Sequence, residues 1–454
     1  MAKLCESAIE EMVIEELQSL GYTYISGVDL APDALNPERS SYGDVLLMGR
    51  LQTAVHKLNP TIPADAIQSA VRKLSRIATS NLLADNEEFH KMLVDGVPVE
   101  YRNDSDIKGD TVRVVDFDCP LNNEFLVVNQ YTVVQNNNNK RPDVLLFVNG
   151  IPLVIFELKN PADDNATCHK AYEQLQAYKL AIPGLFTYNE ICIISDGLEA
   201  KAGSLTAPYS RFSTWKTKDG IKEAAKFDNE LSTLIHGLCN PTTLIDYIQS
   251  FVTYEKTQTE DKVTHIVKVE TVKKIAAYHQ YYAVNKALEQ TIRASGYSNK
   301  STNMVREDPA SYGLPSASDQ PKGDRKAGVI WHTQGSGKSL SMVFYTGKIV
   351  RALNNPTIVV ITDRNDLDDQ LFDTFAGNSQ LLRQPPTQAN SCEELKTLLK
   401  VASGGIVFTT IQKFIPDNNE SVYELLSDRD NIVVIADEAH RTQYGFNAKL
   451  RDIK

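Results

Sequence analysis

The sequence predicts an α/β protein with two successive domains, the first built on a mixed sheet and the second on a parallel sheet. Short Val/Phe/Leu runs separated by turns fill residues 112–158 and indicate β-structure. From residue 328 onward, apolar strands expected at 328–331, 357–361, 405–409 and 431–436 alternate with helical segments, which is typical of a parallel sheet covered by helices. A chain of 454 residues is also long for a single core. We therefore expect domains at 1–215 and 263–454, joined by a connector at 216–262.

The composition restricts the class of protein. Hydrophobic residues make up 42% of the chain and charged residues 23%, which are ordinary values for a globular protein. The formal net charge of −11 argues mildly against a nucleic-acid binder, although DNA contacts depend on local basic patches. The six cysteines contain no CxxC pair, which suits neither a zinc site nor a secreted disulfide framework. Because the chain has no apolar signal core and no apolar run of membrane-spanning length, we expect a cytoplasmic protein without membrane contact.

The first domain is expected to begin with an amphipathic helix over residues 6–20. Asn149-Gly150 separates two apolar runs, 144–148 and 151–158, and this is the strongest short-range signal for a β-hairpin. The other expected elements are a largely helical stretch at 46–83, a helix at 166–180 and a buried strand at 190–194.

The predicted hairpin carries a possible metal site. Asp143 opens its first strand, and Glu157 and Lys159 lie near the end of the second. Residues two apart on a strand point to the same face, which the hairpin brings beside Asp143. Asp143 and Glu157 could hold Mg²⁺, which activates a bound water and stabilises charge on a phosphate. Lys159 could orient that water, and Gln174 and Tyr178, at i and i+4 of the next helix, could position the substrate or the lysine.

An Asp followed by Glu-x-Lys is common by chance, but here the pair lies in the very apolar run 153–159, where an unpaired carboxylate is costly. Together with the Gln-x-x-x-Tyr spacing, the pattern resembles the PD-(D/E)xK nuclease superfamily, in its RecB-like branch. The resemblance implies a restriction-endonuclease-like fold. It also implies an acidic residue on the first helix, Glu6 or Glu10; the alternative is that the glutamates of this helix form a solvated face.

The second domain contains a candidate phosphate loop. Gly335-Ser336-Gly337-Lys338-Ser339 follows an expected strand at 328–331 and precedes a helix, which is the context such a loop requires. Backbone N–H groups and the helix N-terminus suit the triphosphate of ATP. Lys338 would reach the β- and γ-phosphates, and Ser339 would hold Mg²⁺. The nucleotide-binding residues expected in this loop are Thr333, Gly335, Ser336, Gly337, Lys338 and Ser339.

A second acidic motif complements the loop. Asp437-Glu438-Ala439-His440 ends the apolar strand expected at 431–436. Asp437 at the strand tip would bind Mg²⁺ through water, and Glu438 would act as the catalytic residue that orients the attacking water. One acidic pair after a strand is often only a helix N-cap. Both motifs in this order within one alternating α/β domain favour phosphoryl transfer.

The DEAH form resembles superfamily 2 helicases and translocases, whose motor domains are RecA-like. Residues 362–367 and 409–413 are similar to two motifs of those proteins, and the resemblance implies DNA contacts by Arg364, Thr410 and Gln412. Residues 278–281 resemble the Q motif, in which Gln280 would read adenine. A lone glutamine on a helix is, however, usually a surface residue.

A PD-(D/E)xK nuclease placed before a DEAH motor resembles the N-terminal part of the restriction (R, HsdR) subunit of type I restriction–modification enzymes. The stretches with closest similarity are 149–159, 278–281, 331–339 and 438–445. The resemblance implies a type I site-specific deoxyribonuclease that translocates double-stranded DNA with ATP and cuts it, with Mg²⁺, away from an unmethylated site. It also implies methyltransferase (M) and specificity (S) subunits as partners. We expect a truncated chain, without the second RecA-like domain of that family and therefore unable to translocate DNA.

Two other functions remain open on the sequence. One is a different DNA nuclease–helicase of repair or antiphage defence, and the other is an inactive module that binds DNA or a partner. Metal-dependent nicking of DNA would separate an active nuclease from an inactive module. The segment 295–327, rich in Ser, Pro, Gly and charge, has no assigned role.

Overall fold

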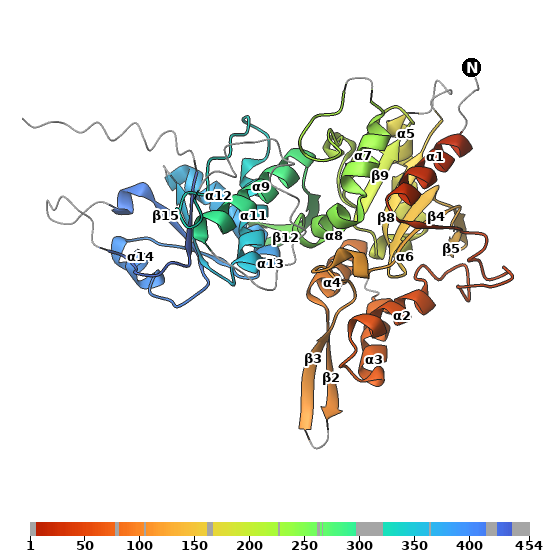
Figure 1. The fold of residues 1–454 in the computed structure, drawn as a ribbon, viewed down its shortest axis with the longest axis horizontal. Helices are drawn as coiled ribbons and strands as arrows, with labels where there is room; N and C mark the ends of the chain where they lie inside the picture. Colours follow the sequence, from red (N-terminus) through yellow and green to blue (C-terminus); the bar gives the residue numbers. More distant parts are fainter. Residues whose placement is uncertain are drawn as a thin grey trace, which may run out of the picture. The chain divides into compact units, whose positions relative to one another are not determined.

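The structure, a computed structural model, describes residues 6–77, 81–103, 106–160, 167–225, 228–260, 264–265, 267–296, 321–362, 365–414 and 425–437. The chain divides into two compact units (Figure 1). The described residues up to Val252 and residues 272–279 form unit 1, and those at 253–271 and from Gln280 onward form unit 2. The helices at Glu230–Leu238 and Pro241–Ser250 therefore pack within unit 1, although the sequence placed them in a connector.

Unit 1 is built on a six-stranded mixed sheet in the order β1-β4-β7-β8-β9-β10. The strands are β1 (Thr23–Ser26), β4 (Phe125–Asn129), β7 (Val144–Val148), β8 (Ile151–Leu158), β9 (Ile191–Ser195) and β10 (Ala200–Gly203). β1 runs parallel to β4 and β8 parallel to β9, while the other neighbours are antiparallel. The expected mixed sheet is therefore confirmed.

The hairpin between β7 and β8 forms at the predicted turn. Asn149 has a φ of 51° and Gly150 a φ of 80°, and positive values at both positions suit a two-residue turn of the I′ type. The Asn149 side chain accepts a hydrogen bond from the Glu124 N–H and donates to the Val114 carbonyl, both at 2.9 Å. A Cβ on Gly150 would lie 2.6 Å from the Leu47 carbonyl oxygen. The turn is thus specified both by its backbone and by its packing.

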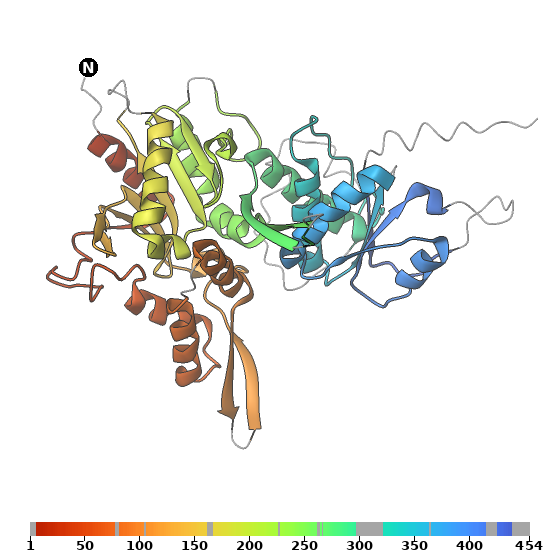
Figure 2. The same ribbon diagram turned by 180° about the vertical axis from the view of Figure 1, so that it is seen from behind.

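Helices cover the sheet of unit 1. α1 (Glu6–Ser19) packs on β1, β4 and β8, and α5 (Cys168–Ala181) packs on β8 and β9. α1 lies in front of the sheet in Figure 1, and α5 lies in front of it in the reverse view of Figure 2. The helical elements are α1 (Glu6–Ser19), α2 (Met48–Leu58), α3 (Ala64–Ser75), α4 (Leu82–Asp95), α5 (Cys168–Ala181), α6 (Pro183–Thr187), α7 (Glu230–Leu238), α8 (Pro241–Ser250), η1 (Pro120–Asn122) and η2 (Tyr209–Arg211).

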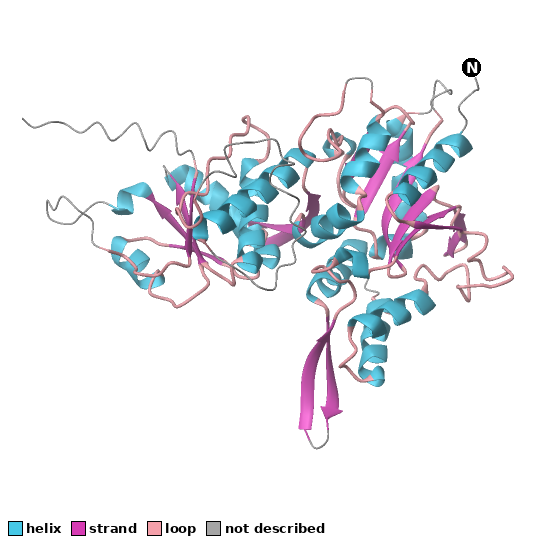
Figure 3. Ribbon diagram, in the orientation of Figure 1, coloured by secondary structure: helices cyan, strands magenta, loops and turns pink. Residues whose placement is uncertain are grey.

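Two small ribbons complete unit 1. The antiparallel pair β2 (Val97–Asn103) and β3 (Asp106–Val112) extends away from the body of the unit (Figure 3). The shorter pair is β5 (Val133–Gln135) and β6 (Asn138–Lys140).

A buried ionic network ties β12 (Val267–Ile275) into unit 1. The Lys273 ammonium donates to the Glu190 carboxylate at 2.8 Å and to the Asn86 side-chain oxygen at 2.9 Å. The other Glu190 oxygen lies 3.1 Å from His90 Nδ1. The Glu190 N–H donates to the Leu153 carbonyl of β8 at 2.7 Å. The network therefore joins Lys273 of β12 to the neighbouring strands β8 and β9.

Unit 2 contains a four-stranded sheet in the order β14-β15-β13-β16, with every pair parallel. The strands are β13 (Thr357–Thr362), β14 (Pro386–Gln388), β15 (Ile406–Thr410) and β16 (Ile432–Ala436), and β11 (Val252–Glu260) joins β12 in a separate two-stranded sheet. The helical elements are α9 (Tyr278–Ser295), α11 (Lys338–Ala352), α12 (Asn365–Gly377), α13 (Ser379–Leu382), α14 (Cys392–Leu398) and η4 (Ile411–Phe414). The expected parallel sheet is confirmed, together with three of its four expected strands.

The fourth expected strand, at 328–331, is wrong. This segment is irregular, and Val329 and Trp331 are 88% and 86% exposed. A strand needs a neighbour to satisfy its backbone N–H and C=O groups. Within the part of unit 2 that the structure describes, β16 pairs with β13 alone, and no strand pairs with 328–331. An apolar run without a neighbour therefore stays irregular. None of the described helices has the length and apolar character to cross a membrane.

Candidate active sites

The open end of the β7–β8 hairpin, opposite its turn, brings together the predicted residues Asp143, Glu157 and Lys159. Val144 pairs with Phe156, so Asp143 lies beside the end of β8. One Asp143 carboxylate oxygen accepts the Leu158 N–H at 2.7 Å. The Lys159 ammonium lies 2.6 Å from a Glu157 oxygen and 3.0 Å from the Leu158 carbonyl. Both carboxylates are buried.

The charges of this cluster suit a divalent cation. Asp143 and Glu157 present two buried carboxylates at one strand end, beside the Lys159 ammonium. Among the described residues, no group of three or more His, Cys, Asp or Glu side chains gathers that could hold a metal. Mg²⁺ is commonly bound by one or two carboxylates and keeps several waters. The pair Asp143 and Glu157 therefore fits Mg²⁺.

The first helix contributes Glu10 to the same region. The buried Glu10 carboxylate accepts from the Gln130 side-chain amide at 2.9 Å on each oxygen. The Gln130 N–H donates to the Asp143 carbonyl at 3.2 Å. Gln130 therefore links the Glu10 carboxylate to the backbone of Asp143. Glu6 was the other candidate on this helix, and its side chain lies outside the described residues.

Gln130 is a residue that sequence reasoning missed. Its φ of 54° lies in the left-handed region, which residues other than glycine rarely adopt. Such a conformation persists where the surroundings hold it, and it often marks functional sites. Gln130 directly follows β4, and Asp143 directly precedes β7. The two residues become neighbours only because β4 and β7 pair, which the sequence alone does not show.

Gln174 and Tyr178 lie together on α5. The Gln174 amide donates to the Tyr178 hydroxyl at 2.6 Å. Tyr178 is buried in the core cluster that also contains Ile155 and Ile194, on the sheet face toward α5. Glu157 follows Ile155 by two positions and thus points to this same face. The structure therefore places the pair on the face that carries Glu157.

The phosphate loop leads into α11 as expected, although the strand expected before it does not form. Gly335 and Gly337 both have a φ of 82°, which a side chain would strain. Gly337 precedes the first residue of α11, and its carbonyl accepts the Ser341 N–H at 3.0 Å. Lys338 and Ser339 form the first turn of this helix. The N-terminus of α11 therefore offers N–H groups and a favourable dipole to a phosphate.

Gln280 contacts the phosphate loop directly. The buried Gln280 side-chain amide donates to the Gly337 carbonyl at 3.0 Å. A Cβ added to Gly337 would lie 2.8 Å from the same nitrogen. In this conformation Gln280 therefore supports the loop backbone, a contact that the sequence did not predict.

The acidic motif follows β16. The Asp437 N–H donates to the Ile361 carbonyl at 2.9 Å, which places Asp437 at the carboxyl edge of the parallel sheet. Thr362 and Thr410 end the neighbouring strands at the same edge. Glu438 and Arg364 lie outside the described residues.

Thr410 and Gln412, the two other residues expected to contact DNA, differ in their exposure to solvent. The Thr410 side chain is buried, so it is not accessible for the expected DNA contact in this conformation. Gln412 in η4 is exposed. The motif resemblance could not predict which of the two is buried, because burial depends on the packing of η4 against β15.

Two family models match the chain in tandem. "Type I restriction enzyme R protein N terminus" matches residues 3–211, which hold the hairpin site. "SWI2/SNF2 ATPase" matches residues 279–453, which hold the phosphate loop and the acidic motif.

Several relatives match most of the chain. The type I restriction enzyme HindI endonuclease subunit of Haemophilus influenzae is 44% identical over 99% of this chain and 40% of its own length. The putative type I restriction enzyme MjaIXP endonuclease subunit of Methanocaldococcus jannaschii is 35% identical over 98% of this chain and 41% of its own length. The SauMRSORF196P endonuclease subunit of Staphylococcus aureus is 23% identical over 98% of this chain and 41% of its own length. The chain thus spans about 40% of the length of the curated relatives it matches.

Proposed function

Because the chain belongs to the family of type I restriction enzyme endonuclease (R) subunits, we propose that it cuts double-stranded DNA at the hairpin site and hydrolyses ATP at the phosphate loop. The observation that carries the nuclease proposal is the meeting of Asp143, Glu157 and Lys159 at the end of β8. Unit 1 is then a nuclease domain of restriction-endonuclease-like fold, and unit 2 is the first RecA-like domain of a DNA translocase. Methyltransferase and specificity subunits are the proposed partners.

At the nuclease site, Asp143 and Glu157 would hold Mg²⁺, which lowers the pKa of bound water and offsets charge on the scissile phosphate. The Lys159 ammonium would donate a hydrogen bond to the attacking water or to a phosphate oxygen. Its ion pair with Glu157 keeps the ammonium at the strand end, so it is already oriented before DNA binds. Glu10, acting through Gln130, would hold the backbone of Asp143 in place.

At the motor site, the loop from Thr333 to Gly337 and the N-terminus of α11 would bind the phosphates of ATP. Lys338 would offset the charge of the β- and γ-phosphates, and Ser339 and Asp437 would hold Mg²⁺. Glu438 would orient the water that attacks the γ-phosphate. Gln280 would keep Gly337 in its left-handed conformation.

The test is cleavage of plasmid DNA, with Mg²⁺ and with or without ATP, by the full-length subunit in complex with its partners. We expect Lys159→Ala to abolish cutting and to spare ATP hydrolysis, because Lys159 belongs to the hairpin site alone. We expect Lys338→Ala to abolish both activities, because cutting depends on translocation. Lys91→Ala, which removes an exposed lysine of α4, is the matched control and should behave as wild type. Normal cutting by Lys159→Ala would make the hairpin structural and end the nuclease proposal.

A further inference from the structure

A surface beside the nuclease site combines basic and aromatic side chains. We call it the basic–aromatic surface, and it consists of His169, Lys170, Tyr172, Lys201, Tyr209 and Arg211. Glu157 on β8 pairs in register with Ile194 on β9, and Ile194 pairs with Lys201 on β10. Adjacent strands lie about 4.8 Å apart, so the Cα atoms of Glu157 and Lys201 are separated by about 10 Å. Residues in register point to the same face, which is the face toward α5.

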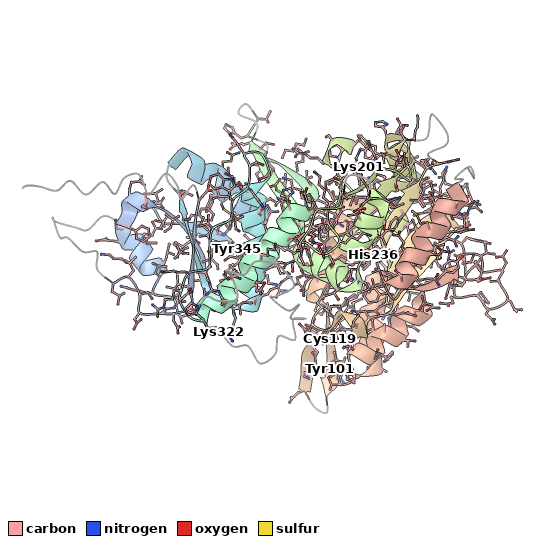
Figure 4. All side chains as sticks on the ribbon, turned by 45° about the horizontal axis from the view of Figure 1, so that its top comes forward. Tyr101, Cys119, Lys201, His236, Lys322 and Tyr345 are labelled. Atoms are coloured by element: carbon pink, nitrogen blue, oxygen red, sulfur yellow. The ribbon has the colours of Figure 1, made fainter. Side chains whose placement is uncertain are left out.

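The N-terminus of α5 lies at this end of the sheet as well. The Cys168 thiol donates to the Glu199 carbonyl, at 3.5 Å, just before β10. The His169 ring packs edge-on against Tyr209, with ring centroids 4.8 Å apart. The Lys201 ammonium lies 5.3 Å from the centre of the Tyr209 ring. Figure 4 labels Lys201 among the side chains of unit 1.

The loop that carries Tyr209 and Arg211 is fixed in place. Phe212 is buried and packs on Gly203, where a Cβ would lie 2.5 Å from the ring. Ala202 and Ser213 exchange two backbone hydrogen bonds, both of 2.9 Å. Because Phe212 and Ser213, which directly follow η2, are both held on β10, the position of Arg211 relative to the sheet is defined.

The charges of this surface differ from those of the whole chain, whose net charge is −11. Lys170 pairs with Glu173, and Lys201 pairs with Glu199, each at 2.8 Å. Lys170, Glu173 and Glu199 are exposed and Lys201 is partly exposed. Ion pairs that meet solvent are weak, so a phosphate can compete for the two lysines. Arg211 is exposed, and among the described residues no acidic side chain pairs with its guanidinium.

Lys201 stays protonated at this surface. Partial burial alone would lower its pKa, but the hydrogen bonds to Glu199 and to the Tyr209 hydroxyl outweigh that effect and hold the pKa of Lys201 above its usual value. The ammonium of Lys201 therefore carries its positive charge at neutral pH.

We propose that the basic–aromatic surface binds a backbone phosphate of the DNA substrate, with Arg211 and Lys201 as the contacting residues. A Cα separation of about 10 Å is short enough for one DNA strand to reach both places within a few nucleotides. The contact would thus hold the strand that enters the site a few nucleotides from the scissile phosphate. Tyr209 and His169 support Lys201 and contribute no sequence preference. This proposal rests on the nuclease function proposed for unit 1.

The test measures how salt weakens binding of the full-length protein to a short DNA duplex, with Ca²⁺ replacing Mg²⁺ so that the duplex is not cut. Each neutralised phosphate contributes about 0.9 to the slope of log K against log salt concentration. We expect Arg211→Gln to lower the slope by about that amount, and Arg211→Lys to keep it. Arg72→Gln, which removes an exposed arginine of α3, is the matched control and should leave the slope unchanged. An unchanged slope in Arg211→Gln would overturn the proposal.

A second measurement separates this proposal from the nuclease proposal. Lys159→Ala should lose Mg²⁺-dependent cutting at every DNA concentration. Arg211→Gln should instead cut at the wild-type rate when DNA is saturating and more slowly when it is dilute. If Lys159→Ala cuts normally, the nuclease proposal fails, whatever the slope of Arg211→Gln. If Arg211→Gln cuts normally at every DNA concentration, only the phosphate contact fails.

Discussion

Individual side chains at the hairpin site depend on neighbours that are distant in sequence. Glu10 accepts both hydrogen bonds of the Gln130 amide, and Gln130 in turn donates to the backbone of Asp143. A carboxylate can hold a metal-coordinating residue in place through an intermediate residue, and it then supports metal binding without touching the metal. Glu10 is therefore a positioning residue in our proposal, and Asp143 and Glu157 are the ligands.

We predict that Glu10→Gln lowers Mg²⁺-dependent cutting about tenfold to 100-fold, the usual effect of losing such a supporting contact. The loss should appear as a higher Mg²⁺ requirement, because the change acts on the geometry of Asp143. Titration of cutting against Mg²⁺ measures it in the full-length complex. Glu11→Gln, on the exposed face of the same helix, should cut as wild type. Equal Mg²⁺ curves for both variants would remove Glu10 from the site.

The glycine at the end of the phosphate loop leads to a second prediction. Gly337→Ala would strain a left-handed backbone by about 1 kcal/mol and would press its Cβ against the Gln280 amide. We expect ATP hydrolysis by the full-length complex to fall at least about tenfold, since about 1.4 kcal/mol of lost binding has that effect. Gly405→Ala also places Cβ at a positive φ, but no atom lies within 4 Å of it. That control should keep its ATPase rate, and a similar loss in both variants would exclude a special role for the Gln280 contact.

At the scale of elements, a buried charge network holds the end of β12 that belongs to unit 1, residues 272–275. Burial alone would raise the pKa of Glu190, but the charges of Lys273 and His90 and their hydrogen bonds hold it below its usual value. Burial lowers the pKa of Lys273, and the Glu190 carboxylate partly offsets this. Removal of one partner of a buried pair leaves the other charge uncompensated.

We predict that Glu190→Gln destabilises unit 1 by about 3–5 kcal/mol, and that adding Lys273→Met recovers part of the loss. Hydrogen exchange of the β8 and β9 amides in the full-length protein measures both effects. The folded-state pKa of Glu190 lies below its unfolded value, so its stabilisation is present above the unfolded pKa. That stabilisation is lost as the pH falls through the folded pKa. Protection of these strands should thus decline in acid in the wild type and less so in Glu190→Gln. The absence of that difference would contradict the ionic account.

At the scale of the whole molecule, the two units differ in how completely their apolar segments are buried. In unit 1, the strands β7, β8 and β9 are buried along their full length. In unit 2, the segment 328–331 is exposed, and Val434 on β16 is also exposed. The chain has two tryptophans, and they report on this difference. Trp215 is 4% exposed and Trp331 is 86% exposed.

We predict that iodide quenches Trp331 but not Trp215 in the 454-residue chain. Trp215→Phe isolates the signal of Trp331, which should be strongly quenched because its ring meets solvent. Trp331→Phe isolates the signal of Trp215, which should resist quenching. Weak quenching of Trp331 would mean that the segment 328–331 packs against other residues.

The sequence by itself determined the features that neighbouring residues encode. Asn149-Gly150 specifies its turn through two left-handed residues, and the glycines of the phosphate loop act in the same local way. The alternation of apolar runs predicted three parallel strands, and the spacing of Glu157 and Lys159 predicted their shared face.

Only the tertiary structure decided what depends on partners far along the chain. It brought Glu10 to Gln130, beside Asp143, and it buried Thr410. It brought Lys273 to Glu190, and it left the apolar segment 328–331 without a neighbouring strand. The physical reason is that local conformation follows from adjacent residues, whereas pairing, burial and charge compensation require groups that the sequence separates by many residues and that only folding brings together.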